Sequence, residues 1–186
     1  EKIENPQDPE NMLGYIDALA EDLEKAWQLG FSLPLPAFDH IERVVIAGMG
    51  GSAIGGDLLS AYLAPSCRVP IFSHRNYGLP GWAQGQGTLV VCSSHSGNTE
   101  ETLSSFDAAL ERGCQVMALC TGGSLRARAE ENGKPVWVFE HHGQPRTAVP
   151  VSFGILLALL CRLCLAQVPE SELQEAFTVL REGKAQ

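Results

Sequence analysis

The chain has 186 residues, of which 45% are hydrophobic and 19% are charged. This length and composition are those of one globular domain with a sizeable hydrophobic core. The formal net charge of −9 argues against a nucleic-acid partner, because the protein as a whole repels phosphate. An anionic small molecule must therefore be held by local hydrogen-bond donors.

Composition also argues against a membrane partner and a secretory signal. No basic segment followed by an apolar stretch opens the chain. The most apolar stretch, residues 149–166, is interrupted by polar and helix-breaking residues and falls short of the ~20 apolar residues that span a bilayer. We predict a buried helix there, at a subunit contact of a homodimer.

The six cysteines indicate a reducing, cytoplasmic location. Cys92 and Cys120 fall in predicted central strands, where free cysteine behaves as a small apolar residue. Cys161 and Cys164 form a C-x-x-C pair with no second pair downstream, so we predict core packing there and no metal site.

The first predicted element is a helix with one apolar stripe. Asp8 and Pro9 are typical of a helix start, and apolar residues then recur with helical spacing over residues 12–27. Gly30 is a typical C-terminal stop. The proline-containing segment 31–40 is predicted to be a linker.

The remaining pattern predicts an α/β fold, an open parallel sheet with helices on both faces. The predicted strands are Arg43–Ala47, Val69–Ser73, Thr88–Ser93, Gln115–Cys120 and Pro135–Phe139. The predicted helices are Ala53–Leu63, Glu100–Arg112, Leu125–Asn132, Val151–Ala166 and Pro169–Glu182. Residues 76–87 are rich in Gly and Pro, which predicts an irregular second crossover. We expect one domain over residues 1–186: a helical arm and linker (1–38), an α/β core (39–148) and C-terminal helices (149–186).

Two Gly/Ser-rich turns follow the first and third predicted strands, at residues 48–52 and 93–101. Such turns direct backbone N–H groups and hydroxyls towards the start of a helix, where anions are stabilised. Ligands of open α/β sheets bind beyond the carboxyl ends of the strands, where strand order reverses. If the first and third strands are neighbours, the two turns face each other.

The second turn carries the more specific signal. Ser94, Ser96 and Thr99 offer three hydroxyls within six residues, and Gly97 lets the backbone approach a ligand. Helix capping by Asn98 or Thr99 is the simpler interpretation, but it accounts for only one hydroxyl. A third turn, Thr121–Ser124, lies at the same edge, with Ser124 as a candidate N-cap.

A dinucleotide site is an alternative. Gly48, Gly50 and Ala53 fit the relaxed pattern G-x-G-x-x-A, and Arg75 after the second strand would suit the 2′-phosphate of NADP. That hypothesis, an NADP-dependent reductase, leaves the serine cluster of the second turn without a role.

Together the segments GMGGS (48–52) and SHSGNTEET (94–102) resemble the sugar isomerase (SIS) family, and more narrowly its bifunctional phosphoglucose/phosphomannose isomerases. The resemblance covers about residues 40 to 165. It implies a five-stranded parallel sheet in a three-layer αβα sandwich. It also implies that a sugar phosphate is the small-molecule partner and that no cofactor is needed. The residues implied to hold the phosphate or permit its close approach are Gly50, Gly51, Ser52, Ser94, Ser96 and Thr99. His95 stands where this subfamily often has an aromatic residue.

The turn Gly143-Gln144-Pro145-Arg146 extends the resemblance and implies that Arg146 stabilises an enediolate intermediate. Aldose–ketose isomerisation builds negative charge on the oxygens of two adjacent carbons, and a fixed guanidinium lowers that barrier. The alternative for Arg146 is a surface salt bridge.

The reaction also needs a general base and a ring-opening acid, and these are not evident. Glu140, His141 and His142 follow the fifth strand, but we favour an ordinary loop role for them and no metal site. Glu100 and Glu101 are best explained by the helix dipole. In the similar isomerases the base lies in a second SIS domain, so the expected function is the N-terminal SIS domain of a glucose 6-phosphate/mannose 6-phosphate to fructose 6-phosphate isomerase. A non-catalytic phosphosugar-binding module is the alternative.

Overall fold

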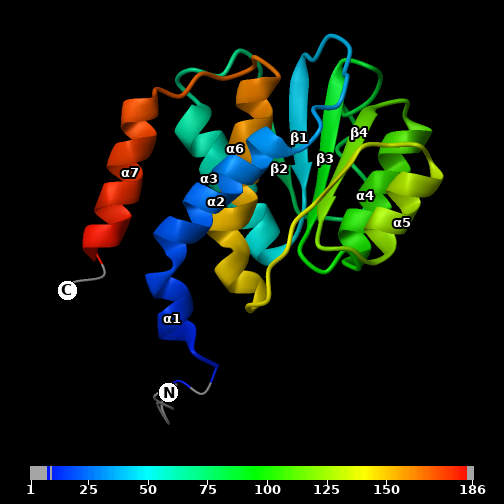
Figure 1. Ribbon diagram of the computed structural model, residues 1–186. Coiled ribbons are helices and arrows are strands. Elements are labelled where there is room, and N and C mark those ends of the chain that lie inside the picture. The colour runs from blue at the N-terminus through cyan, green and yellow to red at the C-terminus, as the bar shows by residue number, and fades with distance from the viewer. Residues whose placement is uncertain (1–7, 9, 184–186) are drawn as a thin grey trace.

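The computed structural model describes residue 8 and residues 10–183, and its centre is a five-stranded parallel sheet (Figure 1). The strands are β1 (Arg43–Ala47), β2 (Ile71–His74), β3 (Thr88–Ser94), β4 (Gln115–Cys120) and β5 (Val136–Val138). They are hydrogen-bonded in the order β2-β1-β3-β4-β5, and every neighbouring pair is parallel. The strand order therefore reverses between β1 and β3, as the expectation for the two turns requires.

Helices cover both faces of this sheet, which confirms the predicted three-layer α/β sandwich (Figure 1). The helices on one side are α3 (Gly50–Leu63) and α6 (Val149–Arg162), with α2 (Leu19–Ser32) packed over α6 and α7 (Glu170–Glu182) outermost. The helices on the other side are α4 (Glu100–Glu111) and α5 (Gly123–Glu131). The short elements α1 (Met12–Asp17) and η1 (Pro145–Ala148) lie near the carboxyl ends of the strands.

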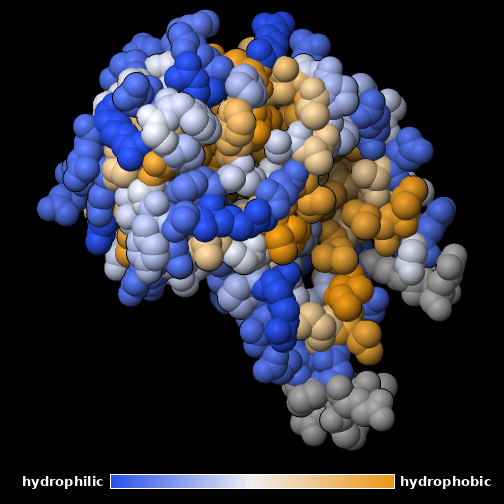
Figure 2. Space-filling view, turned by 180° about the vertical axis from the view of Figure 1, so that it is seen from behind, coloured by the Kyte–Doolittle hydropathy of each residue, from blue (hydrophilic) through white to orange (hydrophobic). Residues whose placement is uncertain are grey.

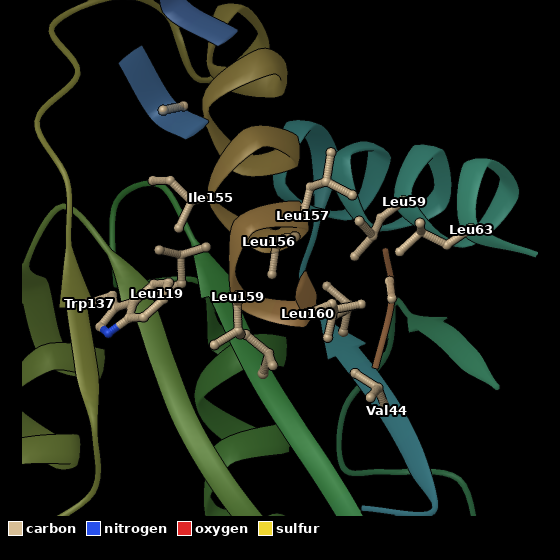
Figure 3. Close-up of a cluster of buried hydrophobic side chains, with 14 of the residues drawn as sticks. Val44, Leu59, Leu63, Leu119, Trp137, Ile155, Leu156, Leu157, Leu159 and Leu160 are labelled. Atoms are coloured by element: carbon tan, nitrogen blue, oxygen red, sulfur yellow. The ribbon is translucent and has the colours of Figure 1, made fainter. Parts of the chain in front are cut away.

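Helix α6 is the central helix of the larger core. Figure 3 shows Ile155 and Leu159 on the side of α6 that faces Leu119 and Trp137, while Leu157 lies towards α3. Among the described residues, the segment Pro145–Arg162 is long and apolar enough to cross a membrane by length and composition alone, but 61% of it is buried inside the protein. Most residues of α6 are buried, as expected of a helix that is apolar on nearly all sides, so the predicted buried helix is confirmed.

The burial of α6 corrects one argument of the sequence analysis. The apolarity of residues 149–166 does not point to a subunit contact, because α2 and the sheet of the same chain cover it. The large exposed hydrophobic side chains lie elsewhere, among them those on α1 (Leu13, Ile16), α3 (Ile54, Leu58, Tyr62) and α7 (Val179, Leu180). Figure 2 shows hydrophobic residues gathered between the two ends of the described chain.

The N-terminal helix differs from the prediction in two ways. It is divided at Ala18 into α1 and α2, and it continues past Gly30 to Ser32. Gly30 is not a helix stop, because it packs so closely on α6 that a Cβ there would overlap the Cβ of Ala158. The N-cap residue of α1 is Asn11 and not Asp8 as predicted, but the Asp8 carboxylate still accepts the N–H groups of Met12 and Leu13, at 2.6 and 2.8 Å; the proline predicted beside Asp8 lies outside the described residues.

Other boundaries shift by a few residues for physical reasons. Strand β2 begins at Ile71, because Pro70 has no N–H and enters the ladder only as an acceptor for the Val44 N–H at 3.0 Å. Helix α5 begins at Gly123, so its N-cap residue is Gly122 and not Ser124. Residues 75–87, all of them described, contain no helix or strand, which confirms the irregular second crossover.

Candidate functional site

The two Gly/Ser turns meet at the carboxyl edge of the sheet. In the β1–β3 ladder Ala47 pairs with Cys92, so the two turns begin side by side. The contact is close: a Cβ on Gly48 would lie 2.7 Å from the carbonyl oxygen of Ser93 and 3.2 Å from the Cβ of Ser52. The geometric expectation that the turns face each other is therefore met.

The first turn leads directly into α3. Gly50 has a φ of +51°, a left-handed conformation that suits glycine, and a Cβ there would meet open space. Gly51 lies against η1, where a Cβ would be 2.6 Å from the carbonyl oxygen of Pro145. Ser52 follows within the first turn of α3 and is buried. Within the described chain no side chain caps α3, so its N-terminal N–H groups are not claimed by a capping residue.

The second turn is organised by its own hydroxyl groups. The Ser94 hydroxyl lies 2.9 Å from that of Thr99 and accepts the N–H of Gly97 at 3.0 Å. The Ser96 hydroxyl accepts the N–H of Asn98 at 3.2 Å. Ser94 is only 2% exposed, whereas Ser96 is exposed. The turn thus combines one buried hydroxyl pair with one hydroxyl that faces solvent.

Capping does not explain this cluster. Thr99 stands at the N-cap position of α4, but its hydroxyl interacts with Ser94 and, among the described residues, no side chain caps the helix. Glu100 and Glu101 lie in the first turn of α4, where the helix dipole favours acidic residues. Glu100 also accepts a hydrogen bond from the Tyr77 hydroxyl at 3.0 Å.

The third turn is joined to the second turn by hydrogen bonds. Asn98 Oδ1 accepts both the N–H and the hydroxyl of Ser124, each at 3.0 Å. The carbonyl oxygen of His95 accepts the hydroxyl of Thr121 at 2.7 Å and its N–H at 3.2 Å. Asn98 is therefore a bridge between turns, a role that its position in the sequence did not reveal.

Arg146 lies in η1, the segment that packs on Gly51. Its side chain is 68% exposed, and a guanidinium nitrogen lies 3.4 Å from a carboxylate oxygen of Glu10. The same carboxylate oxygen accepts the Gln144 amide N–H at 3.0 Å. The surface salt bridge considered from the sequence is thus present, in a segment that adjoins the first turn.

Two histidines far apart in the sequence meet beside the second turn. His95 Nε2 lies 3.0 Å from His141 Nδ1, and the His141 Nε2 lies 3.4 Å from the hydroxyl of Thr147. Burial lowers the pKa of His95, and the adjacent His141 lowers it further. Burial also lowers the pKa of His141, with Asp22 acting in the opposite direction. Sequence reasoning missed this pair, because 46 residues separate its members.

Thr102 is another residue that the sequence did not single out. It lies in the first turn of α4 and is 1% exposed. Its hydroxyl has no hydrogen-bond partner among the described residues. The one signal in the sequence that could have identified Thr102 is its position three residues after Thr99.

The other candidates are arranged less favourably. Glu140 is exposed and borders a pocket of about 420 Å³ together with His141, Asp22 and Lys25. Arg75, the residue considered for an NADP phosphate, pairs with Asp57 on α3. Within the part of the chain that the structure describes, no group of three or more His, Cys, Asp or Glu residues is placed to hold a metal ion.

Comparison with known proteins identifies the family. The chain is 40% identical over 163 residues to a bifunctional phosphoglucose/phosphomannose isomerase from Caldicellulosiruptor bescii, a match that covers 87% of the chain and 48% of that relative. The chain is an SIS-family homologue of these isomerases. It spans about half the length of the relatives it matches. No family model matches the chain.

Solved structures of the SIS fold agree with this assignment. Glucosamine-6-phosphate deaminase from Thermotoga maritima has a TM-score of 0.60 at 15% identity, over 91% of the chain and 53% of that structure. The NanR protein of Vibrio vulnificus, solved with ManNAc-6P, has a TM-score of 0.54 at 20% identity, over 91% of the chain and 66% of that structure. These two likenesses concern the fold alone.

Proposed function

We propose that this SIS chain binds a hexose 6-phosphate and forms part of an aldose–ketose isomerase that interconverts glucose 6-phosphate or mannose 6-phosphate with fructose 6-phosphate. The observation that carries the proposal is the meeting of the two turns between β1 and β3. That edge joins the start of α3 and the start of α4 with the hydroxyls of the second turn.

The phosphate is assigned to the two turns together. Ser52, Ser94, Ser96 and Thr99 supply hydroxyls, and Gly50 and Gly51 let the backbone approach the anion. Helix N-termini stabilise negative charge through their N–H groups and through the helix dipole. Local donors of this kind are needed because the net charge of −9 repels the substrate at long range.

Arg146 is proposed to stabilise the enediolate. A guanidinium lowers the barrier most when it is fixed near the oxygens on which charge develops. The position of η1 against Gly51 supports this role, because it keeps Arg146 close to the first turn. Its exposed pairing with Glu10 is weak in water, so an anionic intermediate competes for the guanidinium at small cost.

The general base is assigned to a part of the enzyme outside this SIS unit. The relatives that the chain matches are about twice as long, which supports a base contributed by a part of those enzymes that this chain does not span. A cytoplasmic homodimer remains our prediction for the assembly. The exposed apolar side chains of α1 and α3, and not α6, are now its proposed contact surface.

A non-catalytic phosphosugar-binding module is the second candidate. It is favoured by one observation: of the carboxylates beside the turns, Glu140 is exposed and Glu100 is already bonded to the Tyr77 hydroxyl. NanR, a structural neighbour solved with ManNAc-6P, has the same fold and is consistent with such a role.

One experiment separates the two candidates. The full-length protein is incubated with fructose 6-phosphate in D₂O, and deuterium at C1 of this ketose and at C2 of the aldose product is followed by NMR, while calorimetry measures binding of fructose 6-phosphate. The isomerase predicts both binding and exchange. Binding without exchange would support the module, and no binding would contradict both.

A further inference from the structure

A directed chain of hydrogen bonds joins the second turn to η1. Thr147 Oγ1 lies 2.8 Å from the carbonyl oxygen of Gln144, which can only accept, so the Thr147 hydroxyl donates its one proton there. His141 Nε2 must then donate to Thr147, which leaves Nδ1 of a neutral His141 as an acceptor. His95 Nε2 consequently donates to His141 Nδ1 at 3.0 Å. The contacts thus assign the Nε2–H tautomer to both rings.

Both ends of this series of hydrogen bonds are fixed. His95 lies between Ser94 and Ser96, and its carbonyl oxygen is held by Thr121 of the third turn. At the other end, Thr147 is 7% exposed and directly follows Arg146 in the sequence. This series of hydrogen bonds therefore joins the turn assigned to the phosphate with η1, the segment that carries Arg146.

We propose that the His95–His141 pair positions Arg146 relative to the phosphate-binding turn, a role that rests on the proposed function. Neither ring is a catalytic residue in this proposal, because each acts through the segment that it holds. A positioning role is chemically reasonable, since a small displacement of a group that stabilises a transition state has a large effect on rate.

Burial favours the neutral form of both rings, whereas Asp22 opposes it by raising the pKa of His141. Helix α2 presents Asp22 and Lys25 to the pocket that His141 borders, and Glu140 lies in the same lining. Helix α1 contributes Tyr15, whose ring centroid is 6.3 Å from that of His141. The remaining neighbours are Phe139, which contacts the His95 ring edge-on, and His142, which lowers the pKa of His141.

The first test uses inorganic phosphate as the probe and the imidazole ¹⁵N signals of the full-length protein as the readout. We expect both rings to show the Nε2–H tautomer at pH 7.5 and phosphate to shift the His141 signals. In His95→Phe, which keeps a ring against Phe139 but removes the donor, phosphate should still bind within about threefold while the His141 response is lost. His142→Phe, at an exposed neighbouring position, is the matched control and should keep the response.

The second test separates positioning from structure. With fructose 6-phosphate, His95→Phe should lower kcat about tenfold and leave KM within about threefold, since the hydroxyls of the turn remain. His95→Gln, which retains an N–H near the Nε2 position, should recover most of the loss. Phosphate binding without any response of His141, or an equal response in His95→Phe, would overturn the inference alone. Failure of the wild type to bind phosphate would overturn the proposed function and the inference with it.

Discussion

Gly97 packs its backbone directly against the carbonyl group of Gly122, so closely that a Cβ at position 97 would overlap that carbonyl oxygen. The contact is reinforced by a hydrogen bond of 2.8 Å from the Leu125 N–H to the Gly97 carbonyl oxygen. The second and third turns thus pack backbone to backbone. Glycine at position 97 is needed first for this contact between turns and only then for access by a ligand.

Gly97→Ala should therefore destabilise the protein by more than about 2 kcal/mol, because it adds a backbone clash to the cost of a left-handed φ of +68°. Urea unfolding measures the change. Gly113→Ala is the matched control: its φ is +65°, but a Cβ there meets open space, so it should cost only about 1 kcal/mol. Equal losses in the two variants would show that the contact with Gly122 is unimportant.

Ser96→Ala should weaken binding of fructose 6-phosphate by about 1–3 kcal/mol, the usual value for a hydrogen bond to a charged group. Its effect on folding should be small, because the side chain is exposed. Ser94→Ala should weaken binding similarly and also lower stability, because the buried hydroxyl accepts the Gly97 N–H. Calorimetry and urea unfolding measure the two quantities. Ser171→Ala on α7, distant in sequence and exposed, should change neither.

Most of the fold was predictable because strands that are covered on both faces are mostly apolar, and such runs are easily recognised in the sequence. The runs that became β1, β3 and β4 are mostly apolar, and their bounds differ from the prediction by at most one residue. Errors arose where tertiary packing overrode local signals. Gly30 is a helix terminator by propensity, but α6 needs a residue without a side chain there, and the helix continues.

The candidate site was predictable only where its residues are close in sequence. The serine cluster of the second turn lies within six residues, and the two turns follow from strand order. The links across the site did not follow, because they join distant residues: Asn98 with Ser124, and His95 with His141. No local sequence pattern indicates such a contact, since each of the paired residues is an ordinary loop residue in its own segment.

Arg146→Gln should lower the rate of deuterium exchange at C1 of fructose 6-phosphate about 100-fold, the scale for losing one charged donor at a developing oxyanion. Stability should stay within about 0.5 kcal/mol, because the pairing with Glu10 is exposed and screened. Arg126→Gln, which removes an exposed ion pair on α5, is the matched control. An Arg146 variant with full exchange activity would remove this residue from the mechanism.

Acid should destabilise the protein through the histidine pair. Burial lowers the folded-state pKa of His95 and His141 below the ordinary value of about 6.5, so below that pH the unfolded chain binds more protons than the folded one. Their contribution to stability is present above pH 6.5 and is lost as the pH falls towards the lowered values. Urea midpoints between pH 7.5 and 5 measure the decline. His95→Phe should make this loss of stability at low pH smaller, whereas His40→Gln, on the linker, should leave it unchanged.

Gly51→Ala tests whether the approach of η1 to the first turn matters for chemistry. Alanine is the better helix former at the start of α3, which favours the variant by up to about 1 kcal/mol. Its Cβ would lie 2.6 Å from the carbonyl oxygen of Pro145, so η1 must move by a few tenths of an ångström or more. We therefore expect lower stability, because the contacting atom belongs to the backbone, and kcat lowered about tenfold, because the displaced segment carries Arg146.

The matched control for this displacement is Gly81→Ala, since a Cβ at position 81 meets open space and its φ is not left-handed. It should change neither unfolding nor turnover. The decisive comparison is Gly51→Ala in an Arg146→Gln background. If Gly51 acts by placing the guanidinium, the two losses in kcat should not multiply, because the second substitution removes the group that the first one misplaces. Independent, multiplying losses would mean that Gly51 serves the phosphate directly and that η1 tolerates the shift.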